Sequence, residues 1–412
     1  MSRKTKTTAT KEEPTQALVP KLRFPEFRDA EGWRERPLGE FLTESRLPGS
    51  KGNLAKKITV KLWGNGVFEK NDAIQGSINT QYFRRTTGQF IYSKLDFLNQ
   101  AFGIIPPLLN NFESTVDLPC FDFRDGLIPA FLLEYVKRKD FYERLGETAD
   151  GSRKARRIHA ETFLAFLIAL PSLPEQARIA DCLSSLDELL AAQARRVEAL
   201  KTHKKGLMEQ LFPRESETQP RLRFPEFRDA GEWESVMIGE LFRVTRGEVL
   251  SMTLVSETTS DEAPFPVYSS QTKNNGLAGF YSTHLYEDSI TWTTDGANAG
   301  DVNFRSGKFF CTNVCGVLIN TDGFSNACVA ALLNGVTHKH VSYVGNPKLM
   351  NGVMAKIEIS LPFVAEQQRI ADCLSSLDDL IAAETRTHEA LKTHKKGLMQ
   401  QLFSSPQAAE QP

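Results

Sequence analysis

Apolar residues recur in alternating steps of four and three positions along two stretches of the chain, residues 174–212 and 363–404. This spacing is the a and d pattern of a coiled coil and predicts two long helices, each with one apolar seam. Because such a helix is not stable alone in water, we expect the two seams to pair with each other, in either direction. The residues of this helix-pair interface are Ile179, Leu183, Leu186, Leu190, Val197, Leu200, Leu207, Ile370, Leu374, Leu377, Ile381, Leu391 and Leu398.

Polar residues interrupt both seams at matching rungs, Gln193 and Lys204 in the first and Glu384 and Lys395 in the second. Polar rungs can set the register by contacting each other or a partner, and a rung that is merely exposed gives the same pattern. The sequence leaves these alternatives open.

The ends of the two helices carry partly matching signals. Pro174 and the acid after it are typical of a helix start, and Pro213 follows the end of the first helix. Residues 364–365 lack the corresponding proline, which leaves the start of the second helix unsettled. Gly206 and Gly397 lie in the last turns, where we expect them to loosen or end the helix locally.

The chain contains two near-identical frames around two dissimilar inserts. Residues 22–30 recur letter for letter as 222–230, residues 175–190 match 366–381 with three changes, and residues 200–212 match 391–403 with one. Residues 43–160 and 243–350 show no defensible alignment. The repeat is far too long for a solenoid. An internal duplication with drifted inserts is one interpretation. We favour frames with one shared task and inserts with two different tasks, because drift would have blurred the frames as well.

The inserts show mixed secondary-structure signals. Ile357, Ile359 and Leu361 alternate with polar residues, which predicts a strand before the second helix. By alignment, the apolar run at 163–170 is predicted to be the equivalent strand. Short β-like runs occur at 89–93 and 308–312, and one helix is expected at 128–144. The repeated block that precedes each insert, residues 22–30 or 222–230, is here called its leading block. Each insert with its leading block is therefore predicted to be an α+β globule.

Composition limits the function classes. The 412 residues include 50 Lys and Arg and 51 Asp and Glu, so any nucleic-acid site must be local rather than spread over a basic protein. Apolar and charged shares of 41% and 25% are those of a globular protein. Cysteine usage predicts no disulfide scaffold and fits a cytoplasmic protein. No apolar run suffices to cross a membrane, and the N-terminus is predicted to be a disordered tail rather than a secretory signal.

Sequence motifs that would carry a reaction are missing. The chain lacks a phosphate loop, a Gly-x-Ser-x-Gly elbow, a His-Glu-x-x-His helix and the Asn-Pro-Pro-[Tyr/Phe] signature of amino-methyltransferases. Cys311, Cys315 and Cys328 lack a fourth ligand at zinc spacing, so we interpret them as core thiols. His203 and His394 lie on Lys-rich helix ends, which favours solvated or carbonyl-capping roles. We expect no catalytic residue and no metal site.

Polar segments suited to recognition occur in both inserts. In the first insert, residues 153–157 hold four cations, and the guanidinium fork of arginine matches phosphate or a guanine edge. In the second, residues 269–275 and 291–298 supply Asn and Gln, which suit adenine, and Ser, Thr and Lys, which suit phosphate. A solvated loop and ordinary turn chemistry explain the same residues without DNA. The predicted DNA-binding residues are Arg84, Arg85, Lys94, Arg153, Lys154, Arg156, Arg157, Ser270, Gln271, Lys273, Asn274, Thr293, Thr294 and Asn298.

These blocks carry a family resemblance that covers nearly the whole chain. Two inserts, each opened by Leu-Arg-Phe-Pro-Glu-Phe and closed by Leu-Pro-x-x-x-Glu-Gln-x-Arg-Ile-Ala, precede helices that end Gly-Leu-Met-x-Gln-Leu-Phe. This arrangement resembles the specificity subunit (S, HsdS-type) of type I restriction-modification systems. The resemblance implies an α+β fold class, with two target recognition domains separated by an antiparallel coiled coil of two long helices in a pseudo-twofold internal repeat.

The resemblance also implies a division of the chain. We expect a tail at 1–19, target recognition domain 1 at 20–171, helical spacer 1 at 172–213, a linker at 214–219, target recognition domain 2 at 220–362, helical spacer 2 at 363–404 and a tail at 405–412. Each recognition domain would read one half of a bipartite DNA target. The helix pair would set the gap between the halves.

The implied partners are double-stranded DNA, two modification (M) subunits and, where present, restriction (R) subunits, with no membrane. The chain itself would be a non-catalytic subunit that binds no cofactor. S-adenosylmethionine for adenine methylation is expected on the modification subunits, and ATP and Mg²⁺ on the restriction subunits. The alternative is a coiled-coil scaffold that binds proteins without recognising DNA. Salt-dependent binding to a split DNA consensus separates these two functions.

Overall fold

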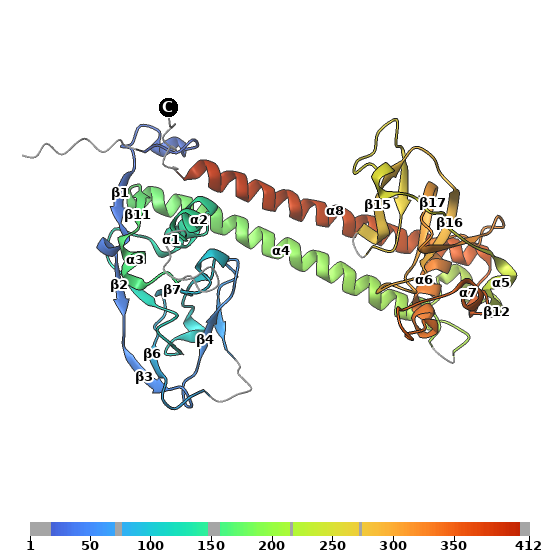
Figure 1. The fold of residues 1–412 in the computed structure, drawn as a ribbon, viewed down its shortest axis with the longest axis horizontal. Helices are drawn as coiled ribbons and strands as arrows, with labels where there is room; N and C mark the ends of the chain where they lie inside the picture. The colour runs from blue at the N-terminus through green and yellow to red at the C-terminus, as the bar shows by residue number, and fades with distance from the viewer. Residues whose placement is uncertain (1–17, 71–75, 147–156, 215–216, 272–273, 404–412) are drawn as a thin grey trace, which may run out of the picture. The chain divides into compact units, whose positions relative to one another are not determined.

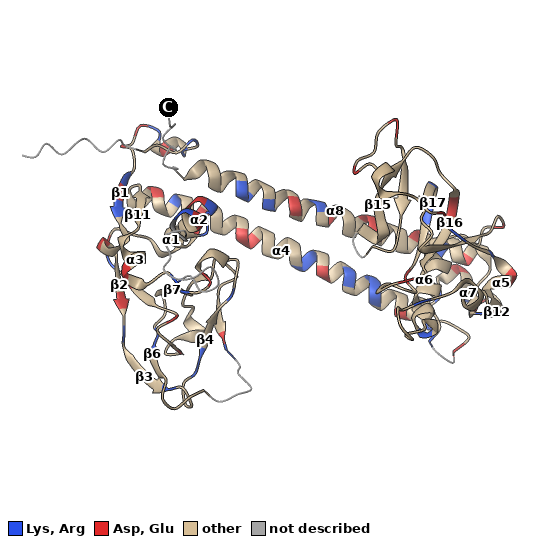
Figure 2. Cartoon of the chain, viewed as in Figure 1, with Lys and Arg blue, Asp and Glu red and all other residues tan. Residues whose placement is uncertain are grey.

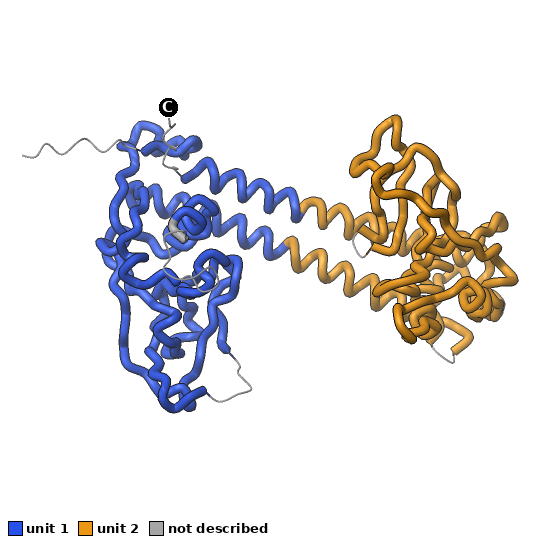
Figure 3. Tube along the Cα trace, in the orientation of Figure 1, with its two compact units in different colours: residues 1–192, 388–412 blue, residues 193–387 orange. Residues whose placement is uncertain are grey.

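The computed structural model describes residues 18–70, 76–146, 157–214, 217–271 and 274–403. It divides the chain into two compact units (Figure 3). The first comprises residues 1–192 and 388–412, and the second comprises residues 193–387. Each unit therefore contains one insert and part of each long helix.

The two predicted helices are present as α4 (Leu173–Leu211) and α8 (Val364–Leu402), each of 39 residues (Figure 1). Both begin at equivalent positions, so the missing proline does not shift the start of α8. Gly206 and Gly397 do not end the helices, since both helices continue for five residues beyond them. An interior glycine costs about 1 kcal/mol, which the buried side chains of Leu211 and Leu402 outweigh.

The seams of α4 and α8 pair within each unit in antiparallel fashion. Every predicted seam residue is buried or half-buried. In the first unit Leu183, near the start of α4, shares a core cluster with Leu402 at the end of α8. In the second unit Leu211, at the end of α4, shares a cluster with Ile370 near the start of α8.

Lysine rungs of the seams form ion pairs across the helix pair. Lys204 Nζ lies 2.6 Å from the Asp378 carboxylate in the second unit, and Lys395 Nζ lies 2.6 Å from the Asp187 carboxylate in the first. The two pairs occupy equivalent positions in the repeat. They resolve the open alternatives for these rungs in favour of contacts between the helices.

The remaining polar rungs also meet. Gln193 Nε2 donates to the Glu384 carboxylate at 2.5 Å, and the Arg196 guanidinium lies 2.8 Å from the same carboxylate. A one-turn slip of either helix would separate these groups, so the rungs specify the register of the seam.

A buried ion pair joins each leading block to the start of its long helix. Arg23 donates to both oxygens of Glu175 at 2.8 and 2.7 Å, and the side chains are 7% and 1% exposed. Arg223 and Glu366 repeat the pair at 2.8 and 2.5 Å. Hydrogen bonding to the carboxylate raises the pKa of both arginines.

The first insert forms several small antiparallel sheets around an aromatic core. Its sheets have the strand orders β2-β10-β7-β8, β3-β6-β9, β4-β5 and β1-β11. Phe90, Tyr92, Phe121 and Phe163 stack in the main core, which Phe403 of the chain's far end also enters. The elements are β1 (Arg34–Pro37), β2 (Leu42–Ser45), β3 (Pro48–Lys51), β4 (Ile58–Val60), β5 (Val67–Glu69), β6 (Gln81–Arg84), β7 (Phe90–Tyr92), η3 (Phe97–Asn99), β8 (Phe102–Ile104), η4 (Pro107–Leu109), β9 (Glu113–Ser114), β10 (Cys120–Phe123), α1 (Pro129–Val136), α2 (Lys139–Gly146), α3 (Ala160–Ala165) and β11 (Leu167–Leu170).

Two predictions for this insert need correction. The single helix expected at 128–144 is two helices, α1 and α2, because the chain turns at Arg138, whose guanidinium lies over the rings of Tyr135 and Phe403. The strand expected at 163–170 is shortened to β11, and the residues before it form α3. An apolar run without period does not distinguish the two conformations.

The second insert is built on one six-stranded sheet of order β13-β18-β16-β17-β14-β15. Only its β14–β17 pair is parallel among the described strand pairs. A separate pair, β12–β19, matches β1–β11 of the first unit. The elements are β12 (Glu234–Met237), α5 (Ile238–Leu241), β13 (Arg243–Arg246), β14 (Phe265–Tyr268), η7 (Asn274–Gly276), β15 (Leu277–Tyr281), β16 (Tyr286–Thr293), β17 (Val302–Cys311), β18 (Cys315–Ile319), α6 (Ala327–Val336), η8 (Thr337–His340), α7 (Asn351–Met354) and β19 (Glu358–Leu361). The inserts thus differ in sheet architecture, while the frames around them match.

Loss of one partner of a buried ion pair tests the role of the frame contacts. Arg23→Met leaves the Glu175 carboxylate buried without its cation and is expected to lower the free energy of unfolding by about 3–5 kcal/mol. Arg178→Met removes an exposed pair with Glu26 and should cost at most about 1 kcal/mol. Urea denaturation followed by circular dichroism measures both. Equal losses would contradict the structural role of Arg23.

Candidate nucleic-acid interface

Charge is mixed along the frames. Lys and Arg are interspersed with Asp and Glu on α4 and α8 (Figure 2). A surface that attracts phosphate must therefore be sought in the inserts, where we compare the predicted DNA-binding residues with their positions in the structure.

Two neighbouring arginines at the end of β6 have opposite environments. Arg84 is exposed. Arg85 is 2% exposed, and its guanidinium donates to Ser114 Oγ and to the Ser45 carbonyl, each at 2.7 Å, and to the Leu118 carbonyl at 3.1 Å. Burial lowers the pKa of Arg85. The prediction of Arg85 as a DNA contact is therefore wrong, because its donors are used to join strands inside the unit.

The basic segment at 153–157 is described only at its end. Arg153, Lys154 and Arg156 lie outside the described residues. Arg157 is half exposed and lies 3.8 Å from the Asp117 carboxylate. The nearby Lys94 is half-buried, and its backbone bonds to Asp117 and Ile158. The role of this segment in DNA binding stays a prediction.

A basic hairpin with an exposed aromatic tip is the feature that the sequence reading missed. Residues 56–70, here named the Trp63 hairpin, contain four lysines and one acid, Glu69. They form β4, β5 and the loop between them. Trp63 in this loop is 60% exposed and Phe68 on β5 is 49% exposed. Lysines around a tryptophan that precedes Gly-Asn-Gly are a sequence signal that could have identified it.

Hydrogen bonds hold the tip of the Trp63 hairpin. Lys61 N donates to the Gly66 carbonyl at 2.9 Å and closes the loop. Trp63 N donates to the Asn99 carbonyl at 2.7 Å, and Gly64 N to the Gln100 carbonyl at 2.9 Å. The base of the hairpin is fixed by apolar burial of Ile58, Val60 and Val67 in a small second core. The conformation of the tip is thus fixed by these hydrogen bonds and by the packing of the hairpin base.

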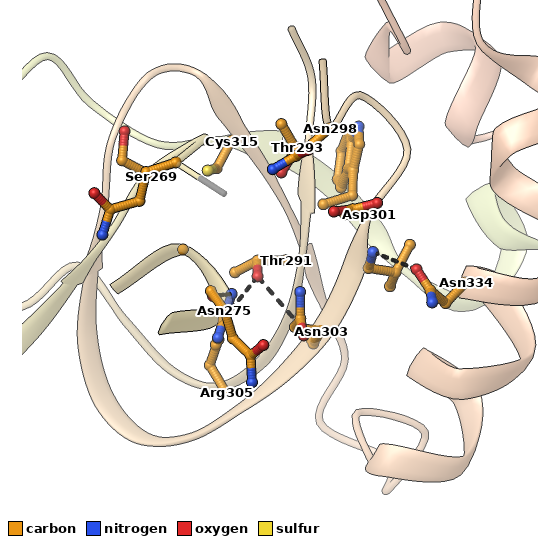
Figure 4. A pocket seen from close by; sticks show the side chains of 14 residues that line it. Ser269, Asn275, Thr291, Thr293, Asn298, Asp301, Asn303, Arg305, Cys315 and Asn334 are labelled. Carbon is orange, nitrogen blue, oxygen red and sulfur yellow. Dashed lines mark hydrogen bonds between the residues drawn. The ribbon is translucent and has the colours of Figure 1, made fainter. Parts of the chain in front are cut away.

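In the second unit, polar side chains converge on a cavity of about 240 Å³ between β16, β17 and the loops beside them (Figure 4). Three predicted residues, Gln271, Thr293 and Asn298, line it. Ser269, Asn275 and Thr291, which belong to the candidate segments 269–275 and 291–298, also line it. The polar lining residues that the sequence did not indicate are Asp301, Asn303, Arg305 and Asn334.

Arg305 is the cation of this cavity. Its Nε donates to Thr291 Oγ1 at 3.1 Å, a terminal nitrogen donates to the Asn275 carbonyl at 2.6 Å, and its guanidinium carbon lies 3.8 Å from the ring centre of Tyr268. Burial lowers the pKa of Arg305. The cavity combines amide, hydroxyl and guanidinium groups, the types that recognise base edges and phosphate.

The other predicted residues of the second insert lie apart from the cavity lining. Ser270 is half-buried and Asn274 is exposed, while Lys273 lies outside the described residues. Thr294 is fully buried, and its hydroxyl donates to the Val314 carbonyl at 2.9 Å and accepts from Arg246 at 2.8 Å. The prediction of Thr294 as a DNA contact is wrong for the same reason as that of Arg85.

The described part of the chain holds no cluster of His, Cys, Asp and Glu with the arrangement of a metal site. Cys311, Cys315 and Cys328 are buried, and burial raises the pKa of Cys328. Among the described helices, none is long and apolar enough to span a membrane.

Comparison with known proteins gives consistent matches. Residues 230–393 match the family model of the type I restriction modification DNA specificity domain. A Mycoplasma pneumoniae protein named as the N-terminus of a type I specificity subunit is 39% identical over 142 residues, which cover 34% of this chain and 74% of that protein. A second type I specificity subunit of that organism is 34% identical over 152 residues, 36% of this chain and about half (49%) of the relative's length.

Solved structures resemble the whole fold. The S subunit of a type I restriction-modification system from M. genitalium matches with a TM-score of 0.62 at 16% identity, covering 94% of this chain and all (100%) of that one. A chain from a study of complex assembly and conformational transition of the type I system matches with a TM-score of 0.54 at 14% identity, covering 91% of this chain and 98% of that one.

The paired arginines of β6 provide a direct test. Arg85→Ala should lower the free energy of unfolding by about 3 kcal/mol, because buried carbonyls lose their donors. Arg84→Ala should change it by less than about 0.5 kcal/mol. If Arg84 contacts phosphate, its loss also reduces the slope of log affinity against log salt concentration by about 1. Denaturation and fluorescence anisotropy with duplex DNA measure the two effects. A destabilised Arg84→Ala, or a stable Arg85→Ala, would reverse the assignment.

Proposed function

Because the chain belongs to the specificity-subunit family of type I restriction-modification systems, we propose that its two inserts each read one half of a bipartite DNA target. The frames would set the gap between the halves and bind two modification subunits. DNA sequence specificity is the property of the family. The split target, the gap and the partner stoichiometry are the proposal.

The main support for this proposal is that the frames match in detail while the inserts do not. The ion pairs of Arg23 and Arg223, the lysine rungs and the strand pairs β1–β11 and β12–β19 recur in both units. The inserts offer a basic hairpin in one unit and a polar cavity in the other. Like frames suit two copies of one partner, and unlike inserts suit two different half-sites.

The exposed faces of α4 and α8 support two equivalent docking sites. Identity at buried positions follows from packing, but identity at exposed positions does not. Leu189 is 48% exposed and Leu380, its equivalent, is 40% exposed. An exposed leucine at the same place in both copies, beside the exposed Ser185 and Ser376, favours contact with a partner over contact with water.

The chemistry of the complex would reside in its partners. The modification subunits would supply S-adenosylmethionine and methylate adenine, and a restriction subunit, where present, would use ATP and Mg²⁺. This chain would contribute binding and position without a reaction of its own. The complex would act in the cytoplasm on double-stranded DNA.

The primary test of the proposed function is to determine the DNA target. Methylome sequencing of cells that carry this chain and its modification subunit should give a split consensus, and the purified chain should bind that duplex in a salt-dependent manner. Binding of partner proteins without any preference for duplex sequence would favour the scaffold function instead.

Lengthening the helix pair should change only the gap. Seven residues inserted after both Ala192 and Ala383 keep the heptad in register and add about 10 Å, which is about three base pairs. The methylome should show the same half-site letters with a longer gap. The same insertion after Thr218, in the linker, should leave the gap unchanged. An unaltered gap in the helix variant, or new half-site letters, would refute the role of the helices as a spacer.

Docking of the modification subunits is tested at the matched leucines. Leu189→Glu and Leu380→Glu place a charge in each proposed interface, and each single variant should bind one modification subunit where the wild type binds two. The double variant should bind none. Stability should change by less than about 0.5 kcal/mol, because both side chains are exposed. Native mass spectrometry measures the stoichiometry, and single variants that retain two subunits would exclude these faces.

A further inference from the structure

Trp63 differs from the other tryptophans of the chain. Of the four, Trp33, Trp233 and Trp292 are 1%, 5% and 1% exposed, and Trp63 is 60% exposed. Its neighbour Leu62 is 39% exposed. A large indole with its face in water is available for a partner with a flat apolar surface.

The backbone beneath Trp63 is strained and fixed. Trp63 has φ 60°, in the left-handed region that glycine and asparagine tolerate and a bulky side chain does not. Gly64 and Gly66, the glycines beside it, also have positive φ, 68° and 89°. The bonds from the amides of Trp63 and Gly64 to Asn99 and Gln100 hold this conformation. A strained residue with an exposed aromatic side chain points to a function of that side chain.

The charge around Trp63 selects the partner. The Trp63 hairpin carries Lys56, Lys61 and Lys70 as exposed cations, with Glu69 as the one acid of residues 56–70. Aromatic side chains among cations form platforms on which nucleobases stack while the cations bind the backbone. A polyanion with flat apolar faces fits both halves of this surface, whereas a protein partner would need acidic residues around an apolar pocket.

We propose that Trp63 stacks on a nucleobase of the half-site read by the first unit, at a step that opens when the DNA binds. This inference rests on the proposed function and adds a base-stacking site to it. Stacking tolerates every base, so Trp63 contributes affinity and local opening of the duplex. Other residues determine the sequence specificity through hydrogen bonds to the bases.

The signal of Trp63 can be isolated because the chain has only four tryptophans. The full chain is labelled with 5-fluorotryptophan and combined with unlabelled modification subunits. The resonance of Trp63 is assigned by its loss in Trp63→Phe. The ¹⁹F shift of Trp63 should move when the target duplex is added, and should not move when the modification subunits are added alone. A shift on addition of the modification subunits alone would identify a protein contact and overturn the proposal.

Variants separate stacking from folding. Trp63→Gly relieves the left-handed strain, so the fold should be as stable as the wild type or more stable, while affinity for the target duplex should fall by about 5- to 100-fold. Trp63→Phe keeps an aromatic face and should retain most of the affinity. Leu108→Ala removes another exposed apolar side chain of the unit, 90% exposed, and should leave affinity unchanged.

The outcomes distinguish this inference from the proposed function. The stacking site alone would be overturned if the wild-type chain binds the split target without a shift of the Trp63 resonance. Unchanged affinity of Trp63→Gly for that target would have the same meaning. Absence of sequence-specific binding by every variant and by the wild type would overturn both.

Discussion

An apolar seam on a 39-residue helix must be covered, and this constraint organises the chain. In each unit, α4 and α8 cover each other's seams, and the ion pairs Lys204–Asp378 and Lys395–Asp187 hold them in one register. In the first unit the antiparallel direction brings the leading block to the end of α8, where Leu22 N donates to the Gln401 carbonyl. In the second unit the leading block follows α4 directly in the chain, and Leu222 N donates to the Gln210 carbonyl. Each leading block is thus bonded to the end of the helix that pairs with its own long helix.

The two frames are alike in their contacts but not in every environment. In the first unit, Lys395 also lies 3.0 Å from the buried Glu134 carboxylate of α1. Burial by itself would raise the pKa of Glu134, but the ammonium groups of Lys137 and Lys395 outweigh it and lower the pKa. In the described part of the second unit, the equivalent Lys204 is paired with Asp378 alone. The frame thus tolerates local differences where an insert packs on it.

The two inserts differ in architecture. The first presents small sheets and a hairpin with a tryptophan at its tip, and the second presents a six-stranded sheet whose strands β16 and β17 line a polar cavity. The frames can remain nearly identical because the buried pairs Arg23–Glu175 and Arg223–Glu366 do not involve the surfaces that vary. The inserts can therefore differ without altering the contacts that hold each frame together.

The repeat, the two helices, their seams and the family were all accessible from the sequence, because heptad spacing and near-identical blocks are local and periodic signals. The direction of the helix pairing followed from the resemblance alone, and the structure supplies its contacts. Surface chemistry depended on the tertiary structure: Arg84 and Arg85 are neighbours in the sequence, yet one is exposed and the other joins buried strands. The cavity around Arg305 joins residues from distant loops and strands, and the exposure of Trp63 depends on which side of its hairpin packs on the core. Burial and convergence are properties of packing between distant segments, which no local pattern encodes.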